Sequence, residues 1–179
     1  MRRIVFISTL MVSSIITSGQ IFSTGQTLKP SAFSFGIEPA AIIDGNSDFI
    51  LFLHGGVGIK KGIDFAARAG VLGPDIYFGG DIEFALPKKM SLAFGAHQFS
   101  HFGLDGTWNI SFPIRNDLRI TSGIDTDLNF TKPDLQFLLW LPISLEIGIK
   151  KNMNFIFEVE IGLTDPAYHF IGGGLNFYL

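Results

Sequence analysis

The stretch "HFIGGGLNFYL" at residues 169–179 alternates strictly between two kinds of side chain. The large apolar set is Ile171, Leu175, Phe177 and Leu179, and the small or polar set between them is Gly172, Gly174 and Asn176. Successive side chains of a β-strand point to opposite faces, whereas helical spacing would mix the two sets. The stretch therefore predicts a strand with one apolar and one polar face.

The same period of two runs back through the chain to Pro30. Ten such runs are predicted as strands, at residues 32–43, 48–59, 62–72, 75–86, 90–99, 106–114, 117–126, 136–149, 152–163 and 168–179. Tight basic turns at 60–61, 87–89, 115–117 and 150–152 alternate with longer or more acidic connections, including 100–106 and 127–134. The basic turns recur about every 28 residues, which is the length of one up-and-down hairpin. The pattern predicts an all-β, antiparallel up-and-down arrangement.

Two observations indicate which face lies inside. After Lys29, every lysine lies in a connection between runs, although a soluble sheet exposes such long polar side chains along its strands. The polar face is also rich in glycine, which inside a narrow barrel makes room for larger polar side chains from other strands. A polar inside and an apolar outside predict a transmembrane β-barrel of about ten strands, with eight as the alternative.

The N-terminus predicts export. Arg2 and Arg3 precede an apolar run at 4–16 and then small residues at 17–19, which is the order of a secretory signal peptide. We expect a signal peptide at 1–19, an N-terminal extension at 20–31 and the barrel at 32–179. Cleavage is expected after Gly19, with Gly25 as the alternative.

These features together resemble the bacterial outer-membrane β-barrel proteins, the small porin-like or OmpA-type barrels, at the level of architecture. The resemblance covers nearly the whole chain and departs from the family at Leu179, where its members usually end in Phe or Trp. It implies a cell-envelope protein in the bacterial outer membrane, in contact with outer-membrane lipid and expected to be a monomer. It also implies that the barrel-assembly machinery reads the last strand through Ile171, Leu175, Phe177 and Leu179.

Composition excludes several other functions. The net charge of −3 and the absence of a basic stripe argue against nucleic acid as a partner. The chain has no cysteine, which excludes disulfides, thiolate metal sites and a lipid anchor on cysteine. No glycine-rich phosphate loop precedes a helix, and we expect no cofactor.

The polar face carries the charges that we expect to form a network in the lumen. They are Glu38, Asp64, Arg68, Asp81, Glu83, Arg119, Asp125, Glu146, Glu158 and Glu160. The hairpins should place Arg68 opposite Gly79 and near Asp81. They should also place Asp64 opposite Glu83 and Arg119 near Glu146. Eight carboxylates exceed two guanidiniums, and an unpaired buried carboxylate costs several kcal/mol. Two alternatives follow: a salt-bridged plug in which some acids are protonated, or a hydrated, cation-preferring channel. The sequence does not decide between them.

The stretch "GAHQFSHFG" at 95–103 offers His97, Ser100 and His101. It is loosely similar to the small outer-membrane lipid A hydrolases, which pair a His and a Ser with an acidic residue. A lipid hydrolase is thus an alternative function, although we expect a non-enzymatic barrel with a structural, surface or channel role. No third ligand is spaced for a metal site, so none is expected. A second alternative is a soluble secreted barrel that binds an apolar ligand, with the two faces inverted.

Overall fold

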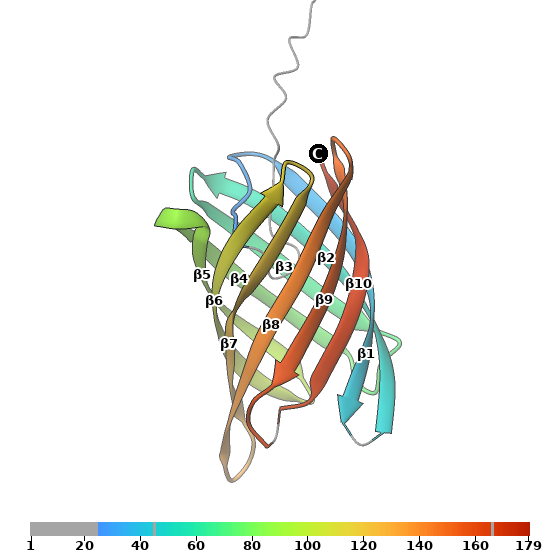
Figure 1. The fold of residues 1–179 in the computed structure, drawn as a ribbon. Coiled ribbons are helices and arrows are strands. Elements are labelled where there is room, and N and C mark those ends of the chain that lie inside the picture. The colour runs from blue at the N-terminus through green and yellow to red at the C-terminus, as the bar shows by residue number, and fades with distance from the viewer. Residues whose placement is uncertain (1–24, 45, 166) are drawn as a thin grey trace, which may run out of the picture.

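The computed structural model describes residues 25–44, 46–165 and 167–179. These residues form a closed antiparallel barrel of ten strands in which each strand pairs with its neighbours in the sequence (Figure 1). The strands are β1 (Phe33–Asp44), β2 (Asn46–Lys60), β3 (Ile63–Val71), β4 (Tyr77–Leu86), β5 (Met90–Phe99), β6 (His101–Arg115), β7 (Leu118–Phe130), β8 (Leu135–Lys150), β9 (Met153–Gly162) and β10 (His169–Tyr178), with a 3-10 turn η1 (Pro87–Lys89). The predicted fold class and the count of ten are confirmed, and the alternative of eight strands is wrong.

Two predicted segments, the signal peptide and the N-terminal extension, include residues that the structure does not describe. The predicted signal peptide at 1–19 lies outside the described residues, as do residues 20–24 of the predicted extension. Among the described residues, no helix is long and apolar enough to cross a membrane.

The first and last strands close the barrel. Phe35 lies opposite Phe177 in the β1–β10 register, and Ile43 lies opposite His169. At the end of this seam, the amide of Leu179 donates to the carbonyl of Phe33 at 2.9 Å, and the amide of Phe33 donates back at 3.2 Å. The barrel therefore has no open strand edge, as a sheet within a bilayer requires.

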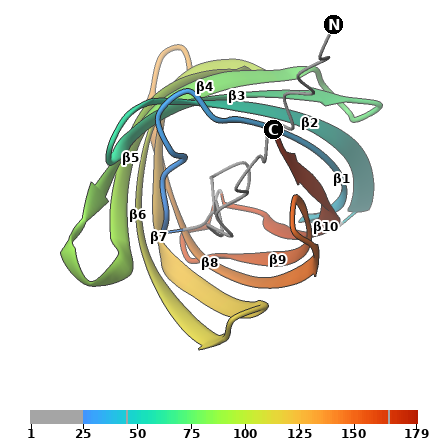
Figure 2. The ribbon, with the colours of Figure 1, turned by 90° about the horizontal axis from the view of Figure 1, so that it is seen from above.

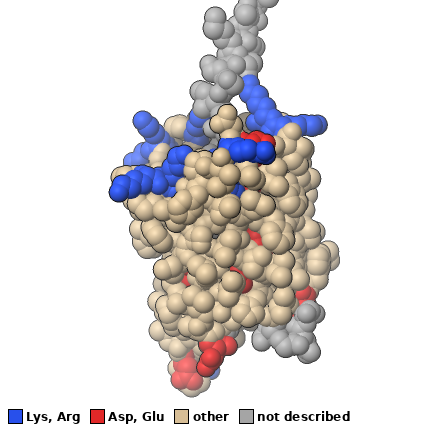
Figure 3. All heavy atoms as spheres, in the orientation of Figure 1, with Lys and Arg blue, Asp and Glu red and all other residues tan. Residues whose placement is uncertain are grey.

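The faces of the sheet are apolar outside and polar inside. On β10, Ile171 and Leu175 are exposed, whereas Gly174 and Asn176 are buried. Large exposed apolar side chains occur on all ten strands. On the face drawn in Figure 3, the middle of the barrel is a broad band with few charged atoms. Buried polar side chains such as Glu83 and Asn109, both 0% exposed, point inward. This is the arrangement of a membrane-spanning barrel, and it contradicts the inverted, soluble alternative.

The two ends of the barrel differ in charge. We call the end with the tight turns at 61–62, 87–89, 116–117 and 151–152 the terminal end, because the C-terminus lies there (Figure 1). Lysines and arginines gather at this end (Figure 3). We call the opposite end the loop end; its connections carry acidic residues such as Asp75, Asp134 and Asp165.

Two predicted loops are wrong. In place of a loop at 100–106, β5 and β6 are joined through Ser100 alone, which takes a φ of 55°. In place of a loop starting at 127, β7 continues to Phe130. Phe102 and Leu104 are exposed on the outside while Gly103 between them is buried, so the alternation continues through this stretch. Gly and Asp favour loops in water, but here they form the inward face of extended strands.

The leading segment, residues 25–31, lies across the mouth of the barrel at the terminal end (Figure 2). The amide of Gly25 donates to the Ser111 hydroxyl at 3.0 Å, and the amide of Leu28 donates to the Asp64 carboxylate at 2.6 Å. The amide of Ser31 donates to the carbonyl of Gly58 at 2.8 Å. Leu28 is only 1% exposed. The described part of the predicted extension therefore narrows the lumen from within.

Candidate functional site

A cavity of about 100 Å³ lies within the lumen, and we call it the chamber. Seven carboxylates line it: Glu38, Asp81, Asp105, Asp125, Asp127, Glu158 and Glu160. Among the described residues, the one guanidinium in its lining belongs to Arg68. The glycines of the inward face, including Gly79, Gly95 and Gly172, leave room for these longer side chains. The chamber is large enough for several water molecules and is strongly acidic.

Between the chamber and the terminal end, buried polar side chains occupy the lumen, and several of them are hydrogen-bonded. Arg119 Nη1 donates to one carboxylate oxygen of Glu146, and the side-chain amide Nδ2 of Asn154 donates to the other. The side chains of Arg119 and Glu146 are only 13% and 6% exposed. The Ser111 and Thr121 hydroxyls lie 2.7 Å apart across the neighbouring strands. This half of the lumen therefore contains one buried ion pair of the kind that a salt-bridged plug would use.

On the other side of the chamber, toward the loop end, lies an aromatic layer. Its members are Phe52, Tyr77, Phe99, Trp140, Tyr168 and Phe170. The rings of Tyr168 and Phe170 meet edge to face at 4.8 Å, and Trp140 Nε1 donates to the backbone carbonyl of Tyr168 at 2.7 Å. Each ring also contributes an apolar wall to the chamber. Anything that reaches the carboxylates from the loop end must therefore pass these rings.

The structure divides the ten predicted network residues between two places. Glu38, Arg68, Asp81, Asp125, Glu158 and Glu160 line the chamber. Asp64, Glu83, Arg119 and Glu146 do not line it. Asp64 lies opposite Glu83 and Arg68 lies opposite Gly79, as the hairpin register predicted. Arg119 lies opposite Glu146, again as predicted.

Asp105 and Asp127 were missed because both fell in predicted loops. The signal that could have found them is the outward alternation on either side, with Phe102 and Leu104 in β6 and Leu128 in β7. Continuing the strands by that period places both aspartates on the inward face.

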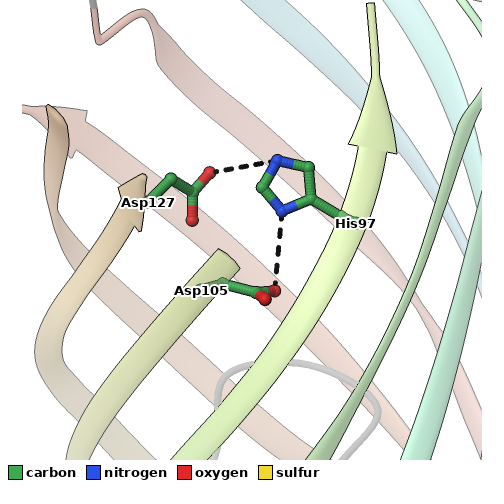
Figure 4. Close-up of side chains that lie close together, drawn as sticks. All are labelled: His97, Asp105 and Asp127. Carbon is green, nitrogen blue, oxygen red and sulfur yellow. Dashed lines mark ion pairs between the residues drawn. The ribbon is translucent and has the colours of Figure 1, made fainter. Parts of the chain in front are cut away.

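His97 lies between these two aspartates (Figure 4). Its Nδ1 is 3.7 Å from an oxygen of Asp105, and its Nε2 is 3.6 Å from an oxygen of Asp127. Nε2 also lies 3.1 Å from the Oδ1 of Asn129. The ring stacks on Tyr77 with the centroids 5.6 Å apart and the planes 16° from parallel. His97 is 5% exposed, so a nitrogen donor is held firmly in the wall of an acidic lumen.

The other two residues of the predicted catalytic group lie elsewhere. Ser100 is exposed at the loop end, and its hydroxyl donates to the carboxylate of Asp75. His101 is exposed at the start of β6. Both ring nitrogens of His97 face Asp105, Asp127 and Asn129. The structure therefore does not bring Ser100 and His97 together as nucleophile and base.

No protein-family model matches the chain, and no curated protein matches it. Among solved structures, it is similar to a transmembrane β-barrel of de novo design at 11% identity and a TM-score of 0.44, over 84% of this chain and 98% of that one. It is also similar to the N-terminal β-barrel domain of Pseudomonas aeruginosa OprF at 9% identity and a TM-score of 0.39, with coverages of 84% and 98%. The assignment to the class of transmembrane β-barrels rests on the closed ten-stranded sheet and its apolar outer face.

Proposed function

We propose that this protein is a narrow, cation-preferring passage in the bacterial outer membrane. One observation carries the proposal: seven carboxylates and a single guanidinium, that of Arg68, line one cavity within the described lumen. Like charges gathered in a region of low dielectric are stabilised by mobile cations and by water. A lumen ringed by carboxylates admits cations and repels anions.

The proposed location follows from the outer face of the barrel. The apolar band covers all ten strands, and the last strand has the alternation that resembles the assembly signal of outer-membrane barrels. We propose that Ile171, Leu175, Phe177 and Leu179 are read by the barrel-assembly machinery before they face lipid. The closed barrel leaves no free strand edge for another copy, which supports a monomer.

A closed structural barrel is the second candidate, and a specific observation favours it. The ion pair of Arg119 with Glu146 and the leading segment occupy the terminal half of the lumen. A passage through this barrel must run beside them, so we expect a small unitary conductance. A lipid hydrolase has less support, because Ser100 bonds to Asp75 and not to His97.

Planar-bilayer recording of the purified mature protein separates these candidates. Under a gradient of KCl, the passage should give a reversal potential of the sign expected for K⁺ over Cl⁻. The double variant Asp125→Asn, Glu160→Gln should lower the permeability ratio several-fold, because it removes two carboxylates from the chamber. The matched control is Asp134→Asn, an exposed carboxylate in the connection between β7 and β8.

Two results would overturn the proposal. Absence of current at every voltage would rule out a passage and would leave the closed structural barrel as the function. An unchanged permeability ratio in the double variant would show that the chamber carboxylates do not set selectivity.

A further inference from the structure

We propose that His97, Asp127 and Asn129 form a binding site for a divalent transition-metal ion of the Zn²⁺ type beside the chamber, whose lining Asp127 shares. The ligand atoms are Nε2 of His97, a carboxylate oxygen of Asp127 and Oδ1 of Asn129. The site goes beyond the proposed passage, because it binds metal whether or not the barrel conducts.

The distances between the donor atoms fit one bound ion. Nε2 of His97 lies 3.1 Å from Oδ1 of Asn129 and 3.6 Å from an oxygen of Asp127. Zinc binds nitrogen and oxygen ligands at about 2.0–2.2 Å, so two donors on a tetrahedral ion lie roughly 3.3–3.6 Å apart. An ion between Nε2 and either of these oxygens would therefore need only small adjustments of the two side chains that bind it. Donor atoms of His97, Asp105 and Asp127 also lie within 4.8 Å of one another.

Asp105 supplies the supporting contact that histidine ligands usually have. One of its oxygens lies 3.7 Å from Nδ1 of His97, on the side of the ring away from Asp127 (Figure 4). Without metal, the N–H at Nε2 donates its proton in a hydrogen bond to Oδ1 of Asn129. An ion that binds displaces this proton to solvent, and a carboxylate at Nδ1 then keeps the remaining proton on that nitrogen. Asp105 is therefore a positioning residue, and Asp127 is the ligand.

The surroundings hold the donors in place and keep space for them. The imidazole of His97 is stacked on Tyr77, which restricts its rotation. Gly103 lies opposite His97 on one side and opposite Asn129 on the other. A Cβ at Gly103 would lie 2.5 Å from Nε2 of His97 and 2.3 Å from Oδ1 of Asn129. A glycine at this position thus allows the two donors to meet.

The chemistry of the donors indicates the class of ion. One imidazole with carboxylate and amide oxygens, in a chain without cysteine, suits borderline ions such as Zn²⁺ better than Cu⁺. Because Asp105 and Asp127 line the chamber, water can reach the site and complete the coordination. The neighbouring carboxylates raise the local concentration of any divalent cation.

The test is calorimetric titration of the untagged barrel, folded in detergent micelles, with ZnCl₂ alone. We expect one Zn²⁺ per barrel, retained in an excess of MgCl₂. His97→Gln and Asp127→Asn should abolish this binding, and Asp105→Asn should weaken it about 10- to 100-fold because it loosens the ring. The matched control is His101→Gln, which removes an exposed histidine four positions along the same hairpin and should bind Zn²⁺ like the unaltered chain.

Folding of each variant is checked by heat-modifiable gel mobility. If His97→Gln does not fold, Gly103→Ala replaces it, because that variant keeps every donor and fills the space between two of them. In side-chain nitrogen NMR of His97, adding ZnCl₂ should end proton exchange at Nε2 and should change the chemical shift of that nitrogen. No stoichiometric binding by the unaltered chain, or equal binding by all the folded variants, would overturn the proposal.

Discussion

The two halves of the lumen both bury polar side chains, but the side chains are of different kinds. Toward the terminal end, most of the buried polar side chains are small hydroxyls and amides: Ser34, Ser91, Asn109, Ser111, Thr121, Ser144 and Asn176. This half also buries three carboxylates, Asp64, Glu83 and Glu146, and Glu146 is paired with Arg119. Toward the loop end, seven carboxylates gather around the chamber. Neutral groups can satisfy one another at short range and close the space between them, whereas carboxylates repel and need water or cations. We therefore expect a rigid terminal half that stabilises the barrel and a hydrated half around the chamber.

The largest expected effect comes from the rigid half. Arg119→Ala leaves the carboxylate of Glu146 without its ion-pair partner in a site only 6% exposed. Loss of one partner of a buried ion pair costs about 3–5 kcal/mol. Urea unfolding of the barrel in lipid vesicles should show this loss of the free energy of unfolding.

The control for this variant is Arg115→Ala. Arg115 pairs with Asp117 on the surface, where the two side chains are 65% and 53% exposed. Such exposed pairs contribute about 0–1 kcal/mol. Equal losses in the two variants would contradict the picture of a rigid, dry terminal half.

The leading segment offers a second test of the difference between the two halves of the lumen. A Cβ at Gly58 would lie 1.8 Å from the carbonyl oxygen of Lys29, so Gly58→Ala should displace the segment from the barrel mouth. We expect a loss of about 1–3 kcal/mol from this overpacking, measured by urea unfolding, and a higher bilayer conductance as the mouth widens.

Gly55→Ala is the matched control on the same strand, because a Cβ there would meet no atom within 4 Å. It should leave both stability and conductance unchanged. A Gly58→Ala barrel as stable as the Gly55→Ala one would show that the segment adds nothing to the rigid half.

The wet half is tested by Arg68→Gln. This variant removes the one guanidinium from the lining of the chamber within the described residues. Because water and cations can enter, we expect a loss of only about 1 kcal/mol and a greater preference for K⁺ over Cl⁻. A loss as large as that of Arg119→Ala, in the same urea assay, would mean that the chamber is not hydrated.

The smallest effect is expected at the rim. Ser100→Ala removes an exposed hydrogen bond to Asp75, which contributes about 0.5 kcal/mol or less. The variant should also leave the mass spectrum of lipid A unchanged on overexpression, relative to the unaltered protein. A change in that spectrum that depends on Ser100 would support the lipid hydrolase as the function.

The sequence predicted the barrel well because its rule is simple and local. Alternation shows which side chains share a face, and antiparallel hairpins then pair Asp64 with Glu83 and Arg119 with Glu146 by counting from a turn. Counting from a turn does not reach the pairing of the first and last strands. That pairing follows from the requirement that a barrel in a bilayer has no open strand edge, and the structure shows it.

The chamber was predicted only in part, and the reason is physical. Asp125 and Asp127 are two positions apart on the same inward face, yet only Asp125 was placed in the lumen. Glycine and aspartate favour turns in water, and the connection at 127–134 was interpreted in that sense. The contacts of residues 25–31 were beyond prediction for another reason. They are made largely by backbone amides, and backbone contacts leave no pattern in the side chains.

The charge at the two ends makes the barrel electrically polar along its axis. The terminal end carries Lys60, Lys61, Lys88, Lys89, Arg115, Lys150 and Lys151 with Asp117, and the loop end carries several aspartates with Lys132 (Figure 3). A cation that arrives from the loop end moves down a falling potential into the chamber, whereas one that arrives from the terminal end must first pass a ring of like charge. If the barrel conducts as proposed, we expect it to rectify, passing cations more readily in one direction than in the other.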